Sequence, residues 1–199
     1  MDIHLSYGRM GLTVALPDAA DVLHTRFKPG LLDEVQAVQD ALRKPIDSAP
    51  LVDLVKPVDS VVVVHTDITR ATPNQRILPV LLDELEAAGV RRRNITLLNG
   101  LGTHRRQTEA ELRAMLGERT VDQYRCLQHD CFDDSNLVSL GITSVGHPVR
   151  VNRDYLNADV RILTGFIEPH FFAGFSGGPK AILPPWPGQK AFSPTMDFR

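Results

Sequence analysis

The sequence predicts an α/β fold, in which a Rossmann-like, mostly parallel sheet carries flanking helices and follows a short amino-terminal β-hairpin. Continuous aliphatic runs such as residues 61–64 are typical of strands buried on both faces. Segments with apolar residues at helical spacing alternate with these runs. This strand–helix–strand order indicates parallel strands that are joined by right-handed crossovers.

The first predicted elements are the hairpin and one helix. Residues 5–8 and 11–17 form the hairpin around a tight turn. A helix is expected over residues 31–42, because leucine and valine recur there at helical spacing before Pro45 ends the pattern.

Two strand–helix units follow the first helix. The strand at 61–64 precedes a helix over 74–88 that Gly89 terminates. The strand at 94–98 precedes a shorter helix, which starts at the capping box 108–111 and ends near residue 117. Further strands are expected at 124–128, at 138–140 and 149–151 as a hairpin, and at 159–164.

Composition excludes several classes of function. Of the 199 residues 43% are hydrophobic and 23% are charged, and the formal net charge of −2 argues against a nucleic-acid module. Cys126 and Cys131 are too far apart for a CxxC motif, so free thiols are expected rather than a zinc site. Neither a leader segment nor an apolar run of spanning length is visible, so no membrane contact and a cytoplasmic location are expected.

The Gly-rich loop 165–180 carries the strongest functional signal. It follows the strand at 159–164, and its only basic side chains are His170 and Lys180. Open α/β sheets bind ligands at the carboxyl ends of their strands. The alternative interpretation is a turn whose phenylalanines fill the core while Lys180 points into water.

Two other loops are expected at the same edge of the sheet. One carries Asp67 and Arg70, which could form an ion pair with each other. Alternatively, Asp67 orients a base while Arg70 binds an anion. A helix N-cap with a nearby ion pair explains this loop equally well. The other presents His104 after two glycines, although a loop histidine is often only an exposed polar residue.

Together, the three loops predict an active site. His104 and His170 suit acid/base chemistry in which either partner takes the proton. Lys180 beside glycines could hold a phosphate or bind a cofactor covalently. A Walker A element is excluded, because Pro179 precedes the lysine and Ala181 follows it.

Four blocks of this sequence resemble the amino-terminal domain of the nickel-pincer lactate racemase family. They are residues 67–73, 102–105, 129–130 and 165–184, and they span nearly the whole chain. The last block is highly specific, and its ordered combination with the first two argues against coincidence.

The resemblance implies an isomerase that racemises or epimerises a small 2-hydroxy acid such as lactate. It implies a nickel-pincer nucleotide, a pyridinium mononucleotide whose two sulfur arms hold nickel, covalently attached at Lys180. His104 and His170 would alternate as acid and base while the α-hydride moves to and from the pyridinium carbon. The residues assigned to binding the cofactor are Lys180, Asp67, Arg70, Gly177 and Gly178.

The sequence departs from the family after Lys180. The family continues to a nickel-binding histidine and a second domain, whereas residues 181–199 contain no histidine. No nickel ligand is therefore assigned to this chain. Residues 1–183 are expected to form the family's α/β domain, and 184–199 a divergent or truncated tail.

The absence of the family's histidine after Lys180 has two explanations. The chain is either a fragment that works with a missing carboxyl-terminal domain or a divergent member. The alternative function is a non-catalytic domain or remnant that binds a mononucleotide or an anion and needs a carboxyl-terminal partner. A phosphate-binding module unrelated to nickel, with Arg70 and Lys180 as anion contacts, is a third possibility.

Overall fold

The computed structural model describes residues 1–24, 26, 28–144, 146, 148–170 and 174–182. The chain forms two compact units, Met1–Leu32 and Asp33–Arg199. The predicted tail at 184–199 lies outside the described residues. Within the described part of the chain, none of the helices combines the length and apolarity that crossing a membrane requires.

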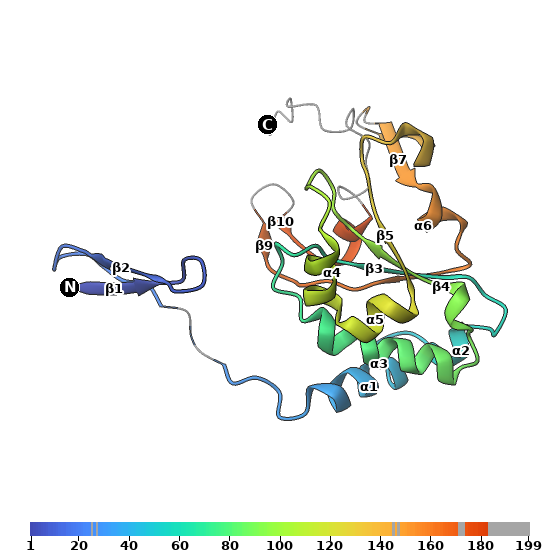
Figure 1. Ribbon diagram of the computed structural model, residues 1–199, viewed down its shortest axis with the longest axis horizontal. Helices are drawn as coiled ribbons and strands as arrows, with labels where there is room; N and C mark the ends of the chain where they lie inside the picture. The colour runs from blue at the N-terminus through green and yellow to red at the C-terminus, as the bar shows by residue number, and fades with distance from the viewer. Residues whose placement is uncertain (25, 27, 145, 147, 171–173, 183–199) are drawn as a thin grey trace. The chain divides into compact units, whose positions relative to one another are not determined.

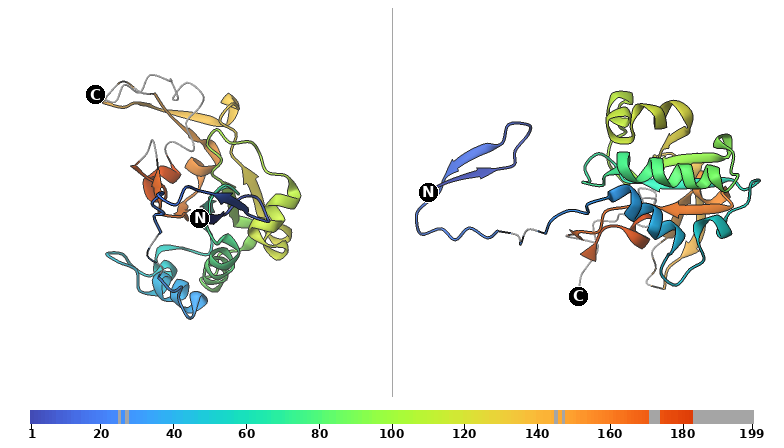
Figure 2. Two further views of the ribbon diagram at one scale, coloured as in Figure 1. Left: turned by 90° about the vertical axis from the view of Figure 1, so that its left-hand side faces the viewer. Right: turned by 90° about the horizontal axis from the view of Figure 1, so that it is seen from below.

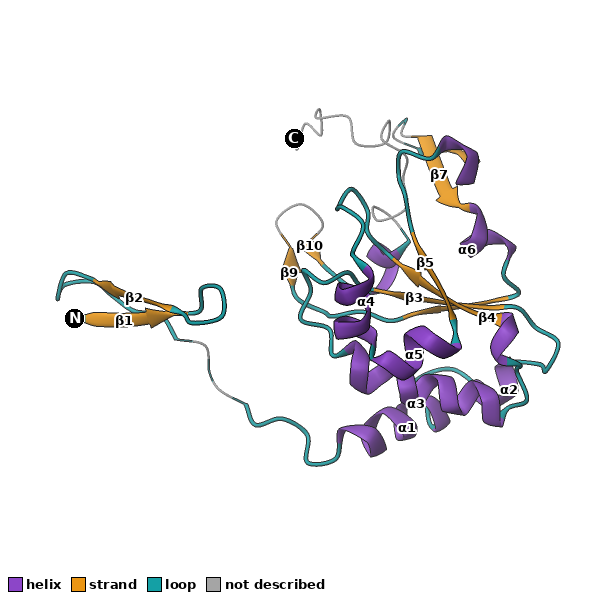
Figure 3. Ribbon diagram, viewed as in Figure 1, coloured by secondary structure: helices purple, strands orange, loops and turns teal. Residues whose placement is uncertain are grey.

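The first unit contains the predicted hairpin. Strands β1 (Asp2–Leu5) and β2 (Leu12–Ala15) pair antiparallel, with Leu5 opposite Leu12 (Figure 3). Side chains alternate between the two faces of a strand, so Ile3 and Val14 share one face with this leucine pair. The hairpin is therefore amphipathic, and its strands lie a few residues from the predicted positions.

The second unit is built on a four-stranded parallel sheet (Figure 1). Its order is β5 (Arg125–Gln128), β4 (Ile95–Asn99), β3 (Val61–His65) and β8 (Val160–Leu163). All three strand pairs are parallel. Every residue of β3 is buried, as the uninterrupted valine run predicts.

Two separate cores cover the two faces of this sheet. Val61 and Val63 pack with helix α3 (Asn74–Ala87) and with Leu116 of helix α4 (Glu109–Leu116). Val62 and Val64 pack on the opposite face, against strand β7 (Pro148–Asn152) and helix α6 (Arg153–Asn157). In the right-hand view of Figure 2, helix α3, drawn in green, lies in front of the sheet.

The remaining elements frame these two cores. They are the helices α1 (Glu34–Arg43), α2 (Leu51–Leu54), α5 (Glu118–Gln123) and α6 (Arg153–Asn157), and the antiparallel strands β6 (Leu137–Ile142) and β7 (Pro148–Asn152). The helices α2, α5 and α6 were not predicted from the sequence. Each of them has six residues or fewer, too few to display a helical repeat.

Local capping fixes the helix boundaries. Asp33 accepts a hydrogen bond from the backbone N–H of Gln36, so α1 begins after Asp33 rather than at residue 31. Thr108 and Glu111 form the predicted capping box of α4. Gly117 ends that helix with a φ of 88°, a value that L side chains rarely adopt.

Buried polar side chains form a layer close to the carboxyl ends of the central strands. The side-chain amide of Asn99 donates to Gln107, and Asn152 lies 3.3 Å from Nδ1 of His129. Nδ1 of His65 lies 3.0 Å from the carbonyl oxygen of Thr66. Burial lowers the pKa of both His65 and His129 to about 4, so both are neutral at physiological pH.

Because of these two histidines, we expect the folded chain to lose stability in acid. Their unfolded-state pKa is about 6.5, so between that pH and about 4 the unfolded chain binds more protons than the folded chain. The free energy of unfolding should therefore fall with acidification across this window, by up to about 1.4 kcal/mol per pH unit for each histidine. Urea denaturation at successive pH values measures this slope.

Variants assign the slope to the two sites. His65→Gln and His129→Gln should each flatten the dependence between pH 6.5 and 4.5, while replacing the exposed His24 with Gln should leave it unchanged. A slope that survives both buried-site substitutions would show that other groups cause the acid sensitivity.

Candidate functional site

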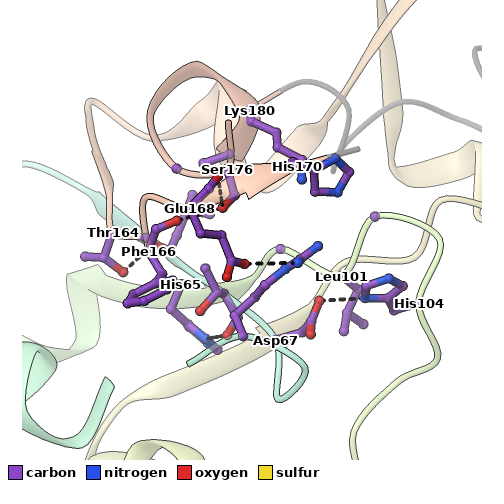
Figure 4. A pocket seen from close by; sticks show the side chains of 18 of the residues that line it. His65, Asp67, Leu101, His104, Thr164, Phe166, Glu168, His170, Ser176 and Lys180 are labelled. Atoms are coloured by element: carbon purple, nitrogen blue, oxygen red, sulfur yellow. Dashed lines mark hydrogen bonds and ion pairs between the residues drawn. The ribbon is translucent and has the colours of Figure 1, made fainter. Parts of the chain in front are cut away.

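The loops that follow β3, β4 and β8 line a cavity of about 570 Å³ (Figure 4). Parallel strands place all of their carboxyl ends at one edge of the sheet, so this convergence follows from the topology. The volume lies within the usual range of small-molecule sites. The structure thus brings the three predicted loops together.

Asp67, in the loop after β3, is held on both of its carboxylate oxygens. It is 3% exposed, and its Oδ1 accepts from the backbone N–H and the hydroxyl of Thr69 at 2.7 and 2.5 Å. Its Oδ2 lies 2.7 Å from Nδ1 of His104. Asp67 therefore orients a histidine instead of pairing with Arg70. It does not cap α3 either, because Pro73 occupies the N-cap without a side-chain hydrogen bond.

His104 is presented by the loop after β4. With the carboxylate of Asp67 beside Nδ1, the tautomer protonated at Nδ1 is favoured, which leaves Nε2 as the hydrogen-bond acceptor. The His104 side chain is 44% exposed. Gly102 allows the turn before it, with a φ of 58°. This pairing across the two loops fixes the orientation of the His104 ring.

The Gly-rich loop after β8 closes on itself. Strand β9 (Pro169–His170) pairs with β10 (Gly174–Phe175), and Ser176 donates its backbone N–H to the carbonyl oxygen of Glu168 at 2.9 Å. The Ser176 hydroxyl donates to the carbonyl oxygen of Phe166 at 2.9 Å. The chain then enters the 3₁₀ turn Gly178–Ala181, which carries Lys180.

Gly165 and Gly177 allow this closure. A Cβ added to Gly165 would lie 3.2 Å from the Cα atom of Gly177. Gly177 lines the cavity with a φ of 79°, and a Cβ there would lie 3.1 Å from Ile167. Gly178 also has positive φ, at 52°, but it is not among the residues that line the cavity.

Arg70 faces a carboxylate that the sequence analysis did not select. Its Nη1 lies 3.3 Å from Oε1 of Glu168, and both residues line the cavity. Glu168 is the only acidic residue in the Gly-rich loop, a signal that could have identified it. The contact joins loops 98 positions apart in the sequence.

Burial and neighbouring cations shift the basic groups of the loop. The pKa of His170 is lowered by burial and then by Lys180 and Arg70, while Glu168 opposes the shift. The pKa of Lys180 is lowered by burial and then by Arg70, while Glu168 and Asp67 oppose it. Both groups therefore lose their protons more readily than in water.

The block 129–130 lies elsewhere. His129 belongs to the buried polar layer, and neither it nor Asp130 lines the cavity. Asp133, in the neighbouring acidic pair, caps a 3₁₀ turn by accepting from Ser135. Within the described residues, no group of three or more histidine, cysteine, aspartate or glutamate side chains could hold a metal ion.

Comparisons with known proteins show which family the chain resembles. Residues 7–193 match the family model described as the lactate racemase N-terminal domain. Lactate racemase of Thermoanaerobacterium thermosaccharolyticum is 36% identical over 187 residues, which cover 92% of this chain and 44% of that protein. Lactate racemase of Lactiplantibacillus plantarum is 38% identical over 153 residues, covering 77% and 36% respectively. The chain thus spans less than half the length of these relatives.

Solved structures show the same fold. The apoprotein of the T. thermosaccharolyticum lactate racemase matches with a TM-score of 0.81 and 34% identity, covering 96% of this chain and 45% of that one. A Thermotoga maritima protein matches with a TM-score of 0.65 and 26% identity, covering 78% and 39%.

Because the Gly-rich loop closes on itself, we expect alanine to destabilise the loop more at Gly177 than at Gly174. Gly174→Ala places a side chain at a φ of 73° in open space and should cost about 1 kcal/mol in backbone strain. Gly177→Ala adds the contacts with Ile167 and Phe166, so it should weaken the loop more. Hydrogen exchange of the Ser176 amide, which is bonded to Glu168, reports the opening of the loop. Equal exchange rates in the two variants would contradict the close approach.

Proposed function

The chain belongs to the lactate racemase N-terminal domain family, and from that premise we propose that it is part of a racemase or epimerase of a 2-hydroxy acid such as lactate. The observation that carries the proposal is the oriented pair Asp67–His104, which shares one cavity with His170 and Lys180. We propose that the remaining length of the enzyme, a carboxyl-terminal domain, completes the substrate pocket.

His104 and His170 act as the acid/base pair in this proposal. Asp67 beside Nδ1 leaves Nε2 of His104 ready to accept the proton of the substrate's 2-hydroxyl group. His170 comes from a different loop, and its lowered pKa keeps it neutral at physiological pH. In that form it can accept a proton. Each histidine serves one enantiomer, as base in one direction and as acid in the other.

The cavity suits the attachment of a nickel-pincer nucleotide. The lowered pKa of Lys180 enlarges the neutral fraction of an amine that lines the cavity, and a neutral amine is the nucleophilic form. Gly100, Gly102 and Gly177 leave room for a flat group, and Arg70 offers donors to an anion. When bound, the group would supply an acceptor and donor of hydride for the substrate's α-hydrogen.

A second candidate is a domain that binds a mononucleotide or another anion without catalysis. The observation in its favour is the presence of Arg70 and Lys180 in one cavity, where both can contact an anion. This candidate predicts binding that does not depend on His104. The racemase proposal requires that histidine.

Histidine variants test the proposal in the full-length enzyme, co-expressed with the proteins that make the cofactor. His104→Ala and His170→Ala should each lower turnover of lactate by about 10²-fold or more, because each loses a positioned acid or base. Intact mass should show unchanged attachment in both variants, whereas Lys180→Arg should lack the added mass. His24→Ala is the control and should retain full turnover. Full activity in the two cavity variants would refute the assigned roles.

Solvent exchange separates hydride return from a simple proton relay. In D₂O, the product enantiomer should keep its original α-hydrogen if that hydrogen leaves and returns as hydride. A relay through the two histidines would instead introduce solvent deuterium at the α-carbon. Mass spectrometry of the product after one turnover therefore decides between the mechanisms.

A further inference from the structure

The charges that line the cavity are balanced. Arg70 and Lys180 are its cations, and Asp67 and Glu168 are its anions, among the residues that the structure describes. Asp67 is already engaged by Thr69 and by His104. Glu168 is therefore the carboxylate that an incoming anion meets at Arg70.

The contact between Arg70 and Glu168 is weak for an ion pair. It is a single contact of 3.3 Å, longer than the roughly 2.7–2.9 Å of a strong charge-assisted hydrogen bond. By comparison, Arg105 binds Glu111 through two hydrogen bonds of 2.8 and 2.6 Å on the surface. Among the described residues, Glu168 is the only side chain that forms a hydrogen bond or ion pair with the guanidinium of Arg70. The guanidinium has five N–H donors, and this contact uses one of them.

The backbones of both partners are held, and the N–H of Arg70 donates to the carbonyl oxygen of Asp67 at 3.1 Å. The backbone of Glu168 is fixed, because its carbonyl oxygen accepts from the N–H and the hydroxyl of Ser176 at 2.9 and 3.3 Å. The guanidinium of Arg70 ends a long, flexible side chain on another loop, and the side chain is 25% exposed. Arg70 can therefore turn to a ligand while Glu168 stays beside the cavity.

We propose that Glu168 determines which anions this site accepts, by competing with the ligand's carboxylate for Arg70 and by repelling a second negative charge. A monoanionic 2-hydroxy acid replaces Glu168 at the guanidinium, an exchange of one carboxylate for another. A dianionic ligand brings its second charge close to Glu168, where like charges disfavour binding. The inference rests on the proposed function, because it takes a 2-hydroxy acid as the ligand.

Calorimetric titration of the full-length enzyme with lactate and with malate, a dianionic 2-hydroxy acid, tests the inference. Glu168→Gln keeps the shape of the side chain and removes its charge. It should tighten lactate binding by about tenfold, or about 1.4 kcal/mol, and malate binding by more. Arg70→Ala should cancel the gain when the two substitutions are combined. Glu84→Gln, which neutralises a glutamate paired with Arg43 outside the cavity, is the matched control and should change neither affinity.

NMR titrations without ligand test the effect of the negative charge of Glu168 on its neighbours. Glu168 raises the pKa of both His170 and Lys180 in the folded chain, so Glu168→Gln should lower both in NMR titrations. Lactate affinity that stays equal or weakens in Glu168→Gln, or pKa values that do not move, would overturn the inference.

Propionate, which lacks the 2-hydroxyl group, separates this inference from the proposed function. If lactate and propionate bind equally and Glu168→Gln tightens both, the competition for Arg70 is upheld and the hydroxy-acid assignment fails. If lactate is preferred and Glu168→Gln has no effect, the proposed function survives and the competition is rejected.

Discussion

Burial of β3 on both faces is the constraint on which the rest of this molecule depends. Val61 and Val63 enter one core while Val62 and Val64 enter the other, so the strand has to lie inside the sheet with both of its faces covered. Its two neighbours, β4 and β8, both run parallel to it. The ends of the three strands therefore coincide, and their polar loops must share one edge of the sheet.

Hydrogen bonds then convert three adjacent loops into one site. The bond between Asp67 and His104 joins the loops after β3 and β4, and the contact between Arg70 and Glu168 joins the loops after β3 and β8. Ser176 closes the third loop on itself. The loop after β3 thus contacts both of the others, which explains why two charged residues three positions apart have different partners.

The sequence predicted the sheet and the convergence of its loops, because continuous apolar runs and alternation with helices are local patterns. It could not show which charged side chains meet, since that depends on loop conformations far apart in the chain. Asp67 had two possible partners, and the structure selects His104, 37 positions away. Glu168 was not selected, although it is the only acidic residue in its loop. The short helices α5 and α6 fell below the length at which periodicity is visible.

The cavity's charges act on each other in a way that links binding to reactivity. Arg70 lowers the pKa of both His170 and Lys180, so the residue best suited to hold an anion also favours the neutral forms of a base and a nucleophile. An anion at Arg70 would offset that effect by adding negative charge beside both groups. Glu168 already exerts part of this effect, so Arg70 and Glu168 act in opposite directions on the pKa values of a histidine and a lysine that burial lowers most.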